Sequence, residues 1–105
     1  MNSSKAKGDR FERQIVDAAL AHRLDAHRVP LSGAVAAYPG DVILRDSTGE
    51  RWVVEAKKRG DGFRELYRWI DRADVVVVGA DRQPALAVVQ LNNFLEVLAR
   101  RVVSR

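Results

Sequence analysis

Two short apolar runs on either side of a glycine-containing turn constrain the fold of this chain most strongly. They are the segments DVILR, residues 41–45, and RWVVEAK, residues 51–57, joined by DSTGE. Runs rich in Val and Ile that are bounded by turn residues predict the two strands of a β-hairpin. Ser47, Thr48 and Gly49 suit a three-residue loop, in which a type I turn is followed by a glycine with positive φ.

The length of this turn determines which residues of the two strands face one another. A three-residue loop pairs Ile43 with Val53 and, two steps further out, Asp41 with Glu55. A loop one residue shorter or longer would shift every pair by one position. Because side chains alternate between the faces of a strand, we expect Asp41, Glu55 and Lys57 to project from the same face.

Three ionisable groups on one face predict either a metal site or a solvated strand end. Opposed strand residues lie roughly 4.5–5.5 Å apart at Cβ, so two carboxylates there repel each other unless a cation lies between them. Mg²⁺ and Mn²⁺ are bound by such oxygen ligands together with waters and phosphate oxygens. Lys57 can then orient or help to deprotonate an attacking water, or offset charge on a phosphate. The alternative is an exposed Glu55–Lys57 pair of little energetic weight.

A fourth ionisable residue, Glu12, lies on the apolar side of a predicted helix. The segment KGDRFERQIVDAALAHRL, residues 7–24, has the spacing of an amphipathic helix with Phe11 and Ile15 on its inward face. On the helical wheel Glu12 falls between Ile15 and Val16. We therefore expect a partner inside the protein, with a metal or the lysine of the hairpin as candidates. The alternative is a solvated side chain that favours the dipole of the first helical turn.

The remaining segments predict a mixed α/β domain. In the second helix we expect Phe63, Leu66, Tyr67 and Ile70 to face inward, and the strand that follows is apolar enough to be buried on both faces. The order α-β-β-β-α-β-β-α predicts a single domain over residues 1–105, with a central sheet flanked by helices and frayed basic ends at 1–7 and 100–105. The further segments are a strand at 25–31, a loop at 32–40, a helix at 63–73, strands at 74–80 and 85–90, and a helix at 91–103.

Composition narrows the classes of function. The 105 residues contain no cysteine, which excludes disulfides and thiolate zinc sites. The apolar runs are too short to span a bilayer, and the first ten residues lack the hydrophobic segment of a signal peptide, so we expect an intracellular, cytoplasmic protein without membrane partners. No Walker-type glycine loop is present, and a nucleotide cofactor is not expected. The net charge of +4 suggests a polyanionic partner such as nucleic acid.

Glu12, the run Pro39-Gly40-Asp41 and the run Glu55-Ala56-Lys57 together resemble the PD-(D/E)xK nuclease superfamily. Within it, the chain is most similar over residues 7–59 to the small Holliday-junction resolvases of archaea and some phages. One departure is that Gly40 separates Pro39 from Asp41. The resemblance implies a restriction-endonuclease-like fold with a central mixed five-stranded sheet.

The same resemblance implies a Mg²⁺-dependent homodimer, with Mn²⁺ as a substitute, that makes paired nicks across a four-way DNA junction. It implies that Asp41 and Glu55 are metal ligands and that Glu12 is the helix carboxylate of the metal site. It further implies that Lys57 is the catalytic lysine and that Ser32 contacts a phosphate or the active site. Two alternatives stay open: a nuclease of the same fold that acts on duplex, nicked or flapped DNA, and a basic DNA-binding module without catalysis.

Basic residues on either side of the expected site are the candidates for phosphate contacts. The row of arginines on the second helix suits either DNA contacts or a solvated face. We expect the dimer interface to use Tyr67, Trp69 or the C-terminal helix. The DNA-binding candidates are Lys5, Lys7, Arg10, Ser32, Lys58, Arg59, Arg64 and Arg68, with Arg72 completing the row.

Overall fold

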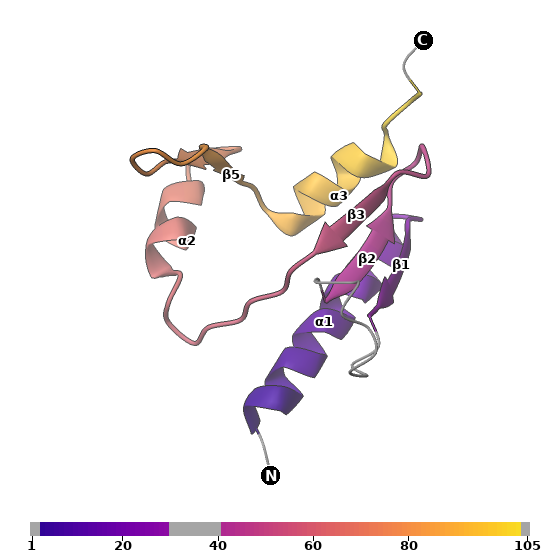
Figure 1. Ribbon diagram of the computed structural model, residues 1–105, viewed down its shortest axis with the longest axis horizontal. Coiled ribbons are helices and arrows are strands. Elements are labelled where there is room, and N and C mark those ends of the chain that lie inside the picture. The colour runs from indigo at the N-terminus through magenta and orange to yellow at the C-terminus, as the bar shows by residue number, and fades with distance from the viewer. Residues whose placement is uncertain (1–2, 30–40, 104–105) are drawn as a thin grey trace. The chain divides into compact units, whose positions relative to one another are not determined.

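The computed structural model describes residues 3–29 and 41–103, which fall into two compact units. Unit 1 takes the chain up to Lys58 and again from Leu95 onward, and unit 2 comprises Arg59–Phe94. The predicted element order is confirmed (Figure 1). Ser32 and the run Pro39-Gly40 lie outside the described residues. The elements are α1 (Ser3–Ala21), β1 (Asp25–Arg28), β2 (Val42–Arg45), β3 (Arg51–Val54), α2 (Arg64–Ile70), β4 (Val76–Val78), β5 (Leu86–Val88) and α3 (Leu91–Ala99).

Helix α1 begins at Ser3, inside the stretch that was expected to be frayed, and ends three residues earlier than predicted. It ends because the chain turns at Arg23, whose φ of 63° lies in the left-handed region, and the Leu24 N–H donates back to the Ala19 carbonyl (3.0 Å). The turn directs Leu24 into the core, where it is buried.

The three-stranded antiparallel sheet of unit 1 has the order β1-β2-β3, and its hairpin register is the predicted one. Ile43 pairs with Val53, and the Asp46 N–H donates to the Glu50 carbonyl (3.0 Å). The turn closes on Gly49, which has a φ of 86°, as the three-residue loop requires. The predicted register is therefore confirmed from the turn out to the pair Val42–Val54.

The core of unit 1 forms where α1 packs against β1 and β2 (Figure 1). Val42 and Leu44 of β2 are almost completely buried, because this strand lies between two neighbours and also carries the helix. Helix α3 contributes Leu95 and Leu98 to the buried apolar side chains. The other buried apolar residues are Ile15, Ala19, Leu24, Val29 and Ile43.

The C-terminal segment is anchored to the turn between β2 and β3. The Ser47 N–H donates to the Leu98 carbonyl (3.1 Å), and Arg101 donates to the carboxylates of Asp46 (2.7 Å) and Glu50 (2.5 Å). The guanidinium also lies 5.9 Å from the ring centre of Trp52, within cation–π range. The tail expected to be frayed from residue 100 is thus held at Arg101.

Unit 2 contains α2, the antiparallel pair β4–β5 and the first turn of α3. The expectation that the strand at 74–80 is buried on both faces is wrong, because Val77 is 66% exposed. The expectation that Tyr67 faces inward is also wrong, since it is 74% exposed, whereas Leu66 and Ile70 are half-buried. A two-stranded sheet with one short helix has too few layers to cover both faces of a strand.

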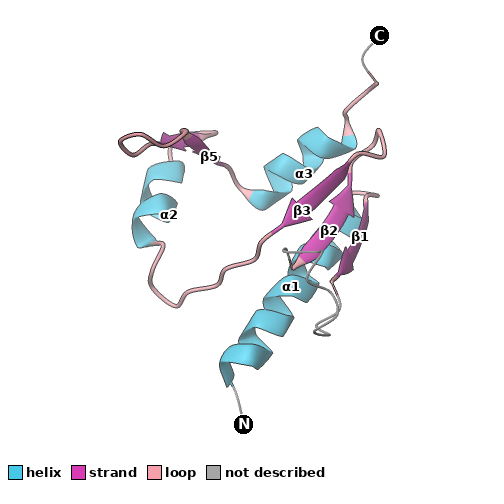
Figure 2. Ribbon diagram, viewed as in Figure 1, coloured by secondary structure: helices cyan, strands magenta, loops and turns pink. Residues whose placement is uncertain are grey.

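The described strands form a three-stranded and a two-stranded sheet, both antiparallel (Figure 2). The single mixed five-stranded sheet that was expected is not confirmed, and the single-domain organisation stays a prediction. Among the described residues no helix is both long and apolar enough to cross a bilayer.

Candidate active site

Asp41 lies directly before β2, and its carboxylate contacts the Glu55-Ala56-Lys57 segment. Its Oδ2 accepts a hydrogen bond from the Ala56 N–H at 2.8 Å. The residues on either side of this N–H are the predicted metal ligand Glu55 and the predicted catalytic Lys57. Hairpin pairing thus brings together the aspartate and the E-x-K segment, as predicted.

The predicted pairing of Asp41 with Glu55 is wrong, because the backbone of Asp41 meets Val54 instead. The β2–β3 ladder ends at the pair Val42–Val54, and the Asp41 N–H donates to the Val54 carbonyl (2.8 Å). Val42 pairs with Val54 in the ladder, and Asp41 also bonds to Val54. Two residues of one strand therefore oppose one residue of the other, as in a β-bulge. On its other side the Asp41 carbonyl accepts from the Val29 N–H (2.9 Å), which fixes the backbone of Asp41 between two strands.

Glu55 and Lys57 form an ion pair, with Nζ 2.8 Å from Oε2. Their side chains are 51% and 64% exposed, so the pair contributes little to the stability of the fold. An exposed carboxylate and ammonium remain accessible to a ligand, whereas the half-buried Asp41 is fixed by its backbone and its bond to Ala56. The three groups share one end of the hairpin.

Glu12 has an internal partner, which is Arg28 of β1. The Arg28 Nε donates to Glu12 Oε1 (2.9 Å), and one terminal nitrogen donates to Asp9 Oδ1 (2.8 Å). The Glu12 side chain is only 13% exposed, so the predicted inward orientation is confirmed. The hydrogen bond with Glu12 raises the pKa of Arg28 above its ordinary value, the charges of Glu12 and Asp9 act in the same direction, and burial opposes them.

Asp41 and Glu55 are the two carboxylates at this end of the hairpin that could hold a metal ion. In the part of the chain that the structure describes, no three Asp, Glu or His side chains gather into a metal-binding group. Mg²⁺ is commonly held by one or two carboxylates, with waters and phosphate oxygens as its other ligands. Asp41 and Glu55 supply that smaller set of hard oxygen donors, while Glu12 binds Arg28.

The basic candidates differ in their surroundings. Lys58 lies over the Phe11 ring with Nζ 5.1 Å from its centre, which brings the end of the E-x-K segment beside α1. Arg64 and Arg68 form exposed ion pairs with Asp61 (2.6 Å) and Glu65 (2.6 Å), so part of their charge is offset. Lys7 is half-buried and Arg10 and Arg59 are exposed, whereas the side chain of Lys5 and the whole of Ser32 lie outside what is described.

Sequence reasoning missed Asp46, which has the most hydrogen bonds of the carboxylates at this hairpin. Its buried side chain accepts from the Thr48 N–H and hydroxyl, the Glu50 N–H and the Trp52 indole. An Asp directly before a Ser-Thr-Gly turn is a signal that would have found it, because Asp carboxylates accept from the backbone two residues on. This residue stabilises the turn that sets the register of Asp41.

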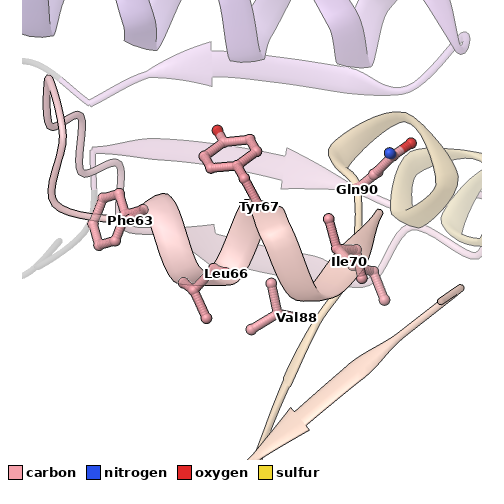
Figure 3. Close-up of a pocket in the computed structure, with 7 residues that line it drawn as sticks. Phe63, Leu66, Tyr67, Ile70, Val88 and Gln90 are labelled. Atoms are coloured by element: carbon pink, nitrogen blue, oxygen red, sulfur yellow. The ribbon is translucent and has the colours of Figure 1, made fainter. Parts of the chain in front are cut away.

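Unit 2 contains an apolar pocket of about 260 Å³, shown in Figure 3. Helix α2 contributes Leu66, Tyr67 and Ile70, and the chain at the end of β5 contributes Val88. Its remaining lining residues are Phe63, Val89 and Gln90. No lining residue carries a charge, and the polar side chains of the lining are those of Tyr67 and Gln90.

Comparison with known proteins gives no relative for this chain. No family model, no curated protein and no solved structure matches it.

Proposed function

We propose that this chain is a metal-dependent, structure-selective DNA endonuclease that resolves four-way junctions by paired phosphodiester hydrolysis. The observation that carries the proposal is the hydrogen bond from the Ala56 N–H to the Asp41 carboxylate, which joins the aspartate to the E-x-K segment. The resemblance to the PD-(D/E)xK superfamily supplies the reaction class. The restriction-endonuclease-like fold with one five-stranded sheet is part of the same proposal.

In this proposal Asp41 and Glu55 hold Mg²⁺, or Mn²⁺ in its place. The ion would supply Lewis-acid activation of a water and of the phosphodiester. Lys57, paired with Glu55, orients the attacking water or offsets the charge that develops on the phosphate. Water attacks the phosphorus in line, and the bond to the 3′ oxygen breaks to leave a 5′-phosphate, as in the family that the chain resembles.

The proposed DNA contacts begin next to the site. Lys58 follows Lys57 directly and is held over Phe11. Arg59 is exposed, and the ion pairs of Arg64 and Arg68 are exposed enough to exchange a carboxylate for a phosphate. A homodimer would present two sites to a substrate with near-twofold symmetry. The exposed Tyr67 and Trp69 or the C-terminal helix α3 are proposed to form the interface.

A non-catalytic DNA-binding module is the second candidate. It is favoured by one observation: Glu12 and Glu55 each have a basic partner within the protein, as in a purely structural arrangement. Such a module binds DNA in a salt-sensitive manner that ignores Mg²⁺.

A substrate panel distinguishes these possibilities. The full chain is incubated with four-way junction, duplex, nicked and flapped DNA, each with Mg²⁺ and with EDTA. We expect symmetric nicks in the junction, only with Mg²⁺, and 5′-phosphate ends. Preferred cleavage of duplex or flap would replace the junction by another substrate, and binding without product on any substrate would contradict the nuclease proposal.

A further inference from the structure

The partners of Glu12 define a three-residue cluster between α1 and β1. Asp9 and Glu12 are one helical turn apart on α1, and both accept hydrogen bonds from Arg28, the last residue of β1. Two different nitrogens of the guanidinium are used, so the fork of Arg28 spans both carboxylates. We call Asp9, Glu12 and Arg28 the Arg28 clamp.

The clamp adjoins the strand position from which Asp41 extends. Arg28 pairs with Val42 in the β1–β2 ladder, and the next residue, Val29, donates its N–H to the Asp41 carbonyl. The clamp therefore fixes α1 to the strand that holds the backbone of Asp41. The side chains of the clamp are 13–29% exposed, so solvent screens these ion pairs less than the exposed Glu55–Lys57 pair.

The cluster gives Glu12 a partner other than the two that were predicted, the metal and the lysine of the hairpin. Glu12 and Asp9 share one guanidinium, and in the described part of the chain no third acidic or histidine side chain joins them to make a metal-binding group. A carboxylate that already neutralises a half-buried arginine gains less from a divalent cation than Asp41, whose carboxylate accepts from the Ala56 amide, or Glu55, whose ion pair with Lys57 is exposed.

We infer that Arg28 is a positioning residue, and that Glu12 supports the site by holding Arg28 and not by binding the metal. The inference rests on the proposed nuclease function. It assigns the carboxylates at the proposed site to two roles. Asp41 and Glu55 bind the metal, and Asp9 and Glu12 bind Arg28.

A metal titration tests the division. Mn²⁺ binding to the metal-free full chain is measured by calorimetry for wild type, Asp41→Asn, Glu55→Gln and Glu12→Gln, with Asp17→Asn, an exposed acid of α1, as the control. We expect a loss of roughly tenfold or more in affinity for Asp41→Asn and Glu55→Gln. We expect Glu12→Gln to stay within about threefold of wild type and Asp17→Asn to match it. An equal loss for Glu12→Gln and Asp41→Asn overturns the inference, whereas unchanged binding in Asp41→Asn contradicts the proposed function.

A stability cycle tests the clamp without any metal. Thermal midpoints are measured for Glu12→Gln, Arg28→Met and the double variant. Each single change is expected to lower the midpoint by roughly 5–10 °C, because Glu12→Gln removes one of the two carboxylates that neutralise Arg28, and Arg28→Met leaves Asp9 and Glu12 without their shared cation. The double variant is expected to fall by less than the two losses added together. Additive losses would overturn the clamp, and Arg28→Lys, which keeps the charge but not the fork, is expected to restore only part of the midpoint.

Discussion

The strand pairs β2–β3 and β4–β5 are both antiparallel and rich in valine, but they bury very different fractions of their side chains. In unit 1 Leu44 is 1% exposed, because α1 and a third strand cover β2. In unit 2 Leu86 is 64% exposed, and none of residues 59–94, all of which the structure describes, is buried. A two-stranded hairpin with a single short helix is at best marginally stable by itself.

This difference indicates which unit can hold catalytic side chains in fixed positions. Catalytic groups must be positioned within a fraction of an ångström, which requires support from packed elements. Asp41 has this support from Val54 of β3 and from Val29, which directly follows β1. The pocket of unit 2 has neither charged groups nor a buried frame. The proposed reaction is therefore assigned to unit 1.

The largest expected effect compares two leucine truncations. Leu44→Ala is expected to lower the free energy of unfolding by about 2–5 kcal/mol, because it opens a cavity in the core. Leu86→Ala is expected to change it by no more than about 0.5 kcal/mol, as for an exposed side chain. Urea denaturation measures both. Similar costs for the two variants would show that Leu86 is covered in solution and would remove the contrast between the units.

The next effect concerns the pH dependence that Asp46 gives to unit 1. Burial by itself would raise the pKa of Asp46, but hydrogen bonds from Thr48, Trp52 and the backbone outweigh it and hold the pKa well below the ordinary value of 3.8. A lowered pKa means that the stabilisation is complete above about pH 5 and is lost as the pH falls from about 4 towards the folded-state pKa.

Asp46→Asn removes this dependence. Its urea midpoint is expected to lie below that of wild type at pH 7, and the gap is expected to narrow as the pH falls from 4 to 2. Asp81→Asn, at an exposed position of unit 2, serves as the control and is expected to follow wild type throughout. A gap between Asp46→Asn and wild type that stays constant from pH 7 to pH 2 would refute the assignment.

A smaller effect is expected on the salt dependence of DNA binding, in which basic residues of the two units are compared. Lys58→Met is expected to lower the slope of log affinity for DNA against log salt by about 1, since one phosphate contact is lost. Arg68→Met is expected to change the slope by less, because Glu65 already offsets part of its charge. Fluorescence anisotropy at several salt concentrations gives both slopes. A larger change for Arg68→Met would move the main DNA contact to unit 2.

The hairpin was predictable from sequence because its geometry depends on neighbouring residues. The length of the turn and the positive φ of Gly49 set the register, which brings Asp41 to the same end of the hairpin as the E-x-K segment. The bulge at Asp41 was not predictable, because it depends on how Val29 and Val54 hold its backbone from both sides.

The partner of Glu12 and the exposure of unit 2 depend on tertiary structure. The helical wheel predicted correctly that Glu12 points inward, but it does not show that Arg28 of β1 lies there, because that depends on how the helix crosses the sheet. The apolar run around Val77 predicted a buried strand, but burial also requires a layer on each face. The local sequence pattern thus predicted the helices and strands, but it did not predict which elements pack against one another.

Single-turnover cleavage of a synthetic four-way junction in Mg²⁺ by Asp41→Asn tests the central claim most directly. Asp74→Asn, at an exposed acid of unit 2, is the matched control, and circular dichroism verifies that both variants are folded. We expect wild type and Asp74→Asn to cleave at equal rates and Asp41→Asn to be slower by at least about 100-fold. Unchanged cleavage by a folded Asp41→Asn variant would contradict the assignment of the reaction to this end of the hairpin.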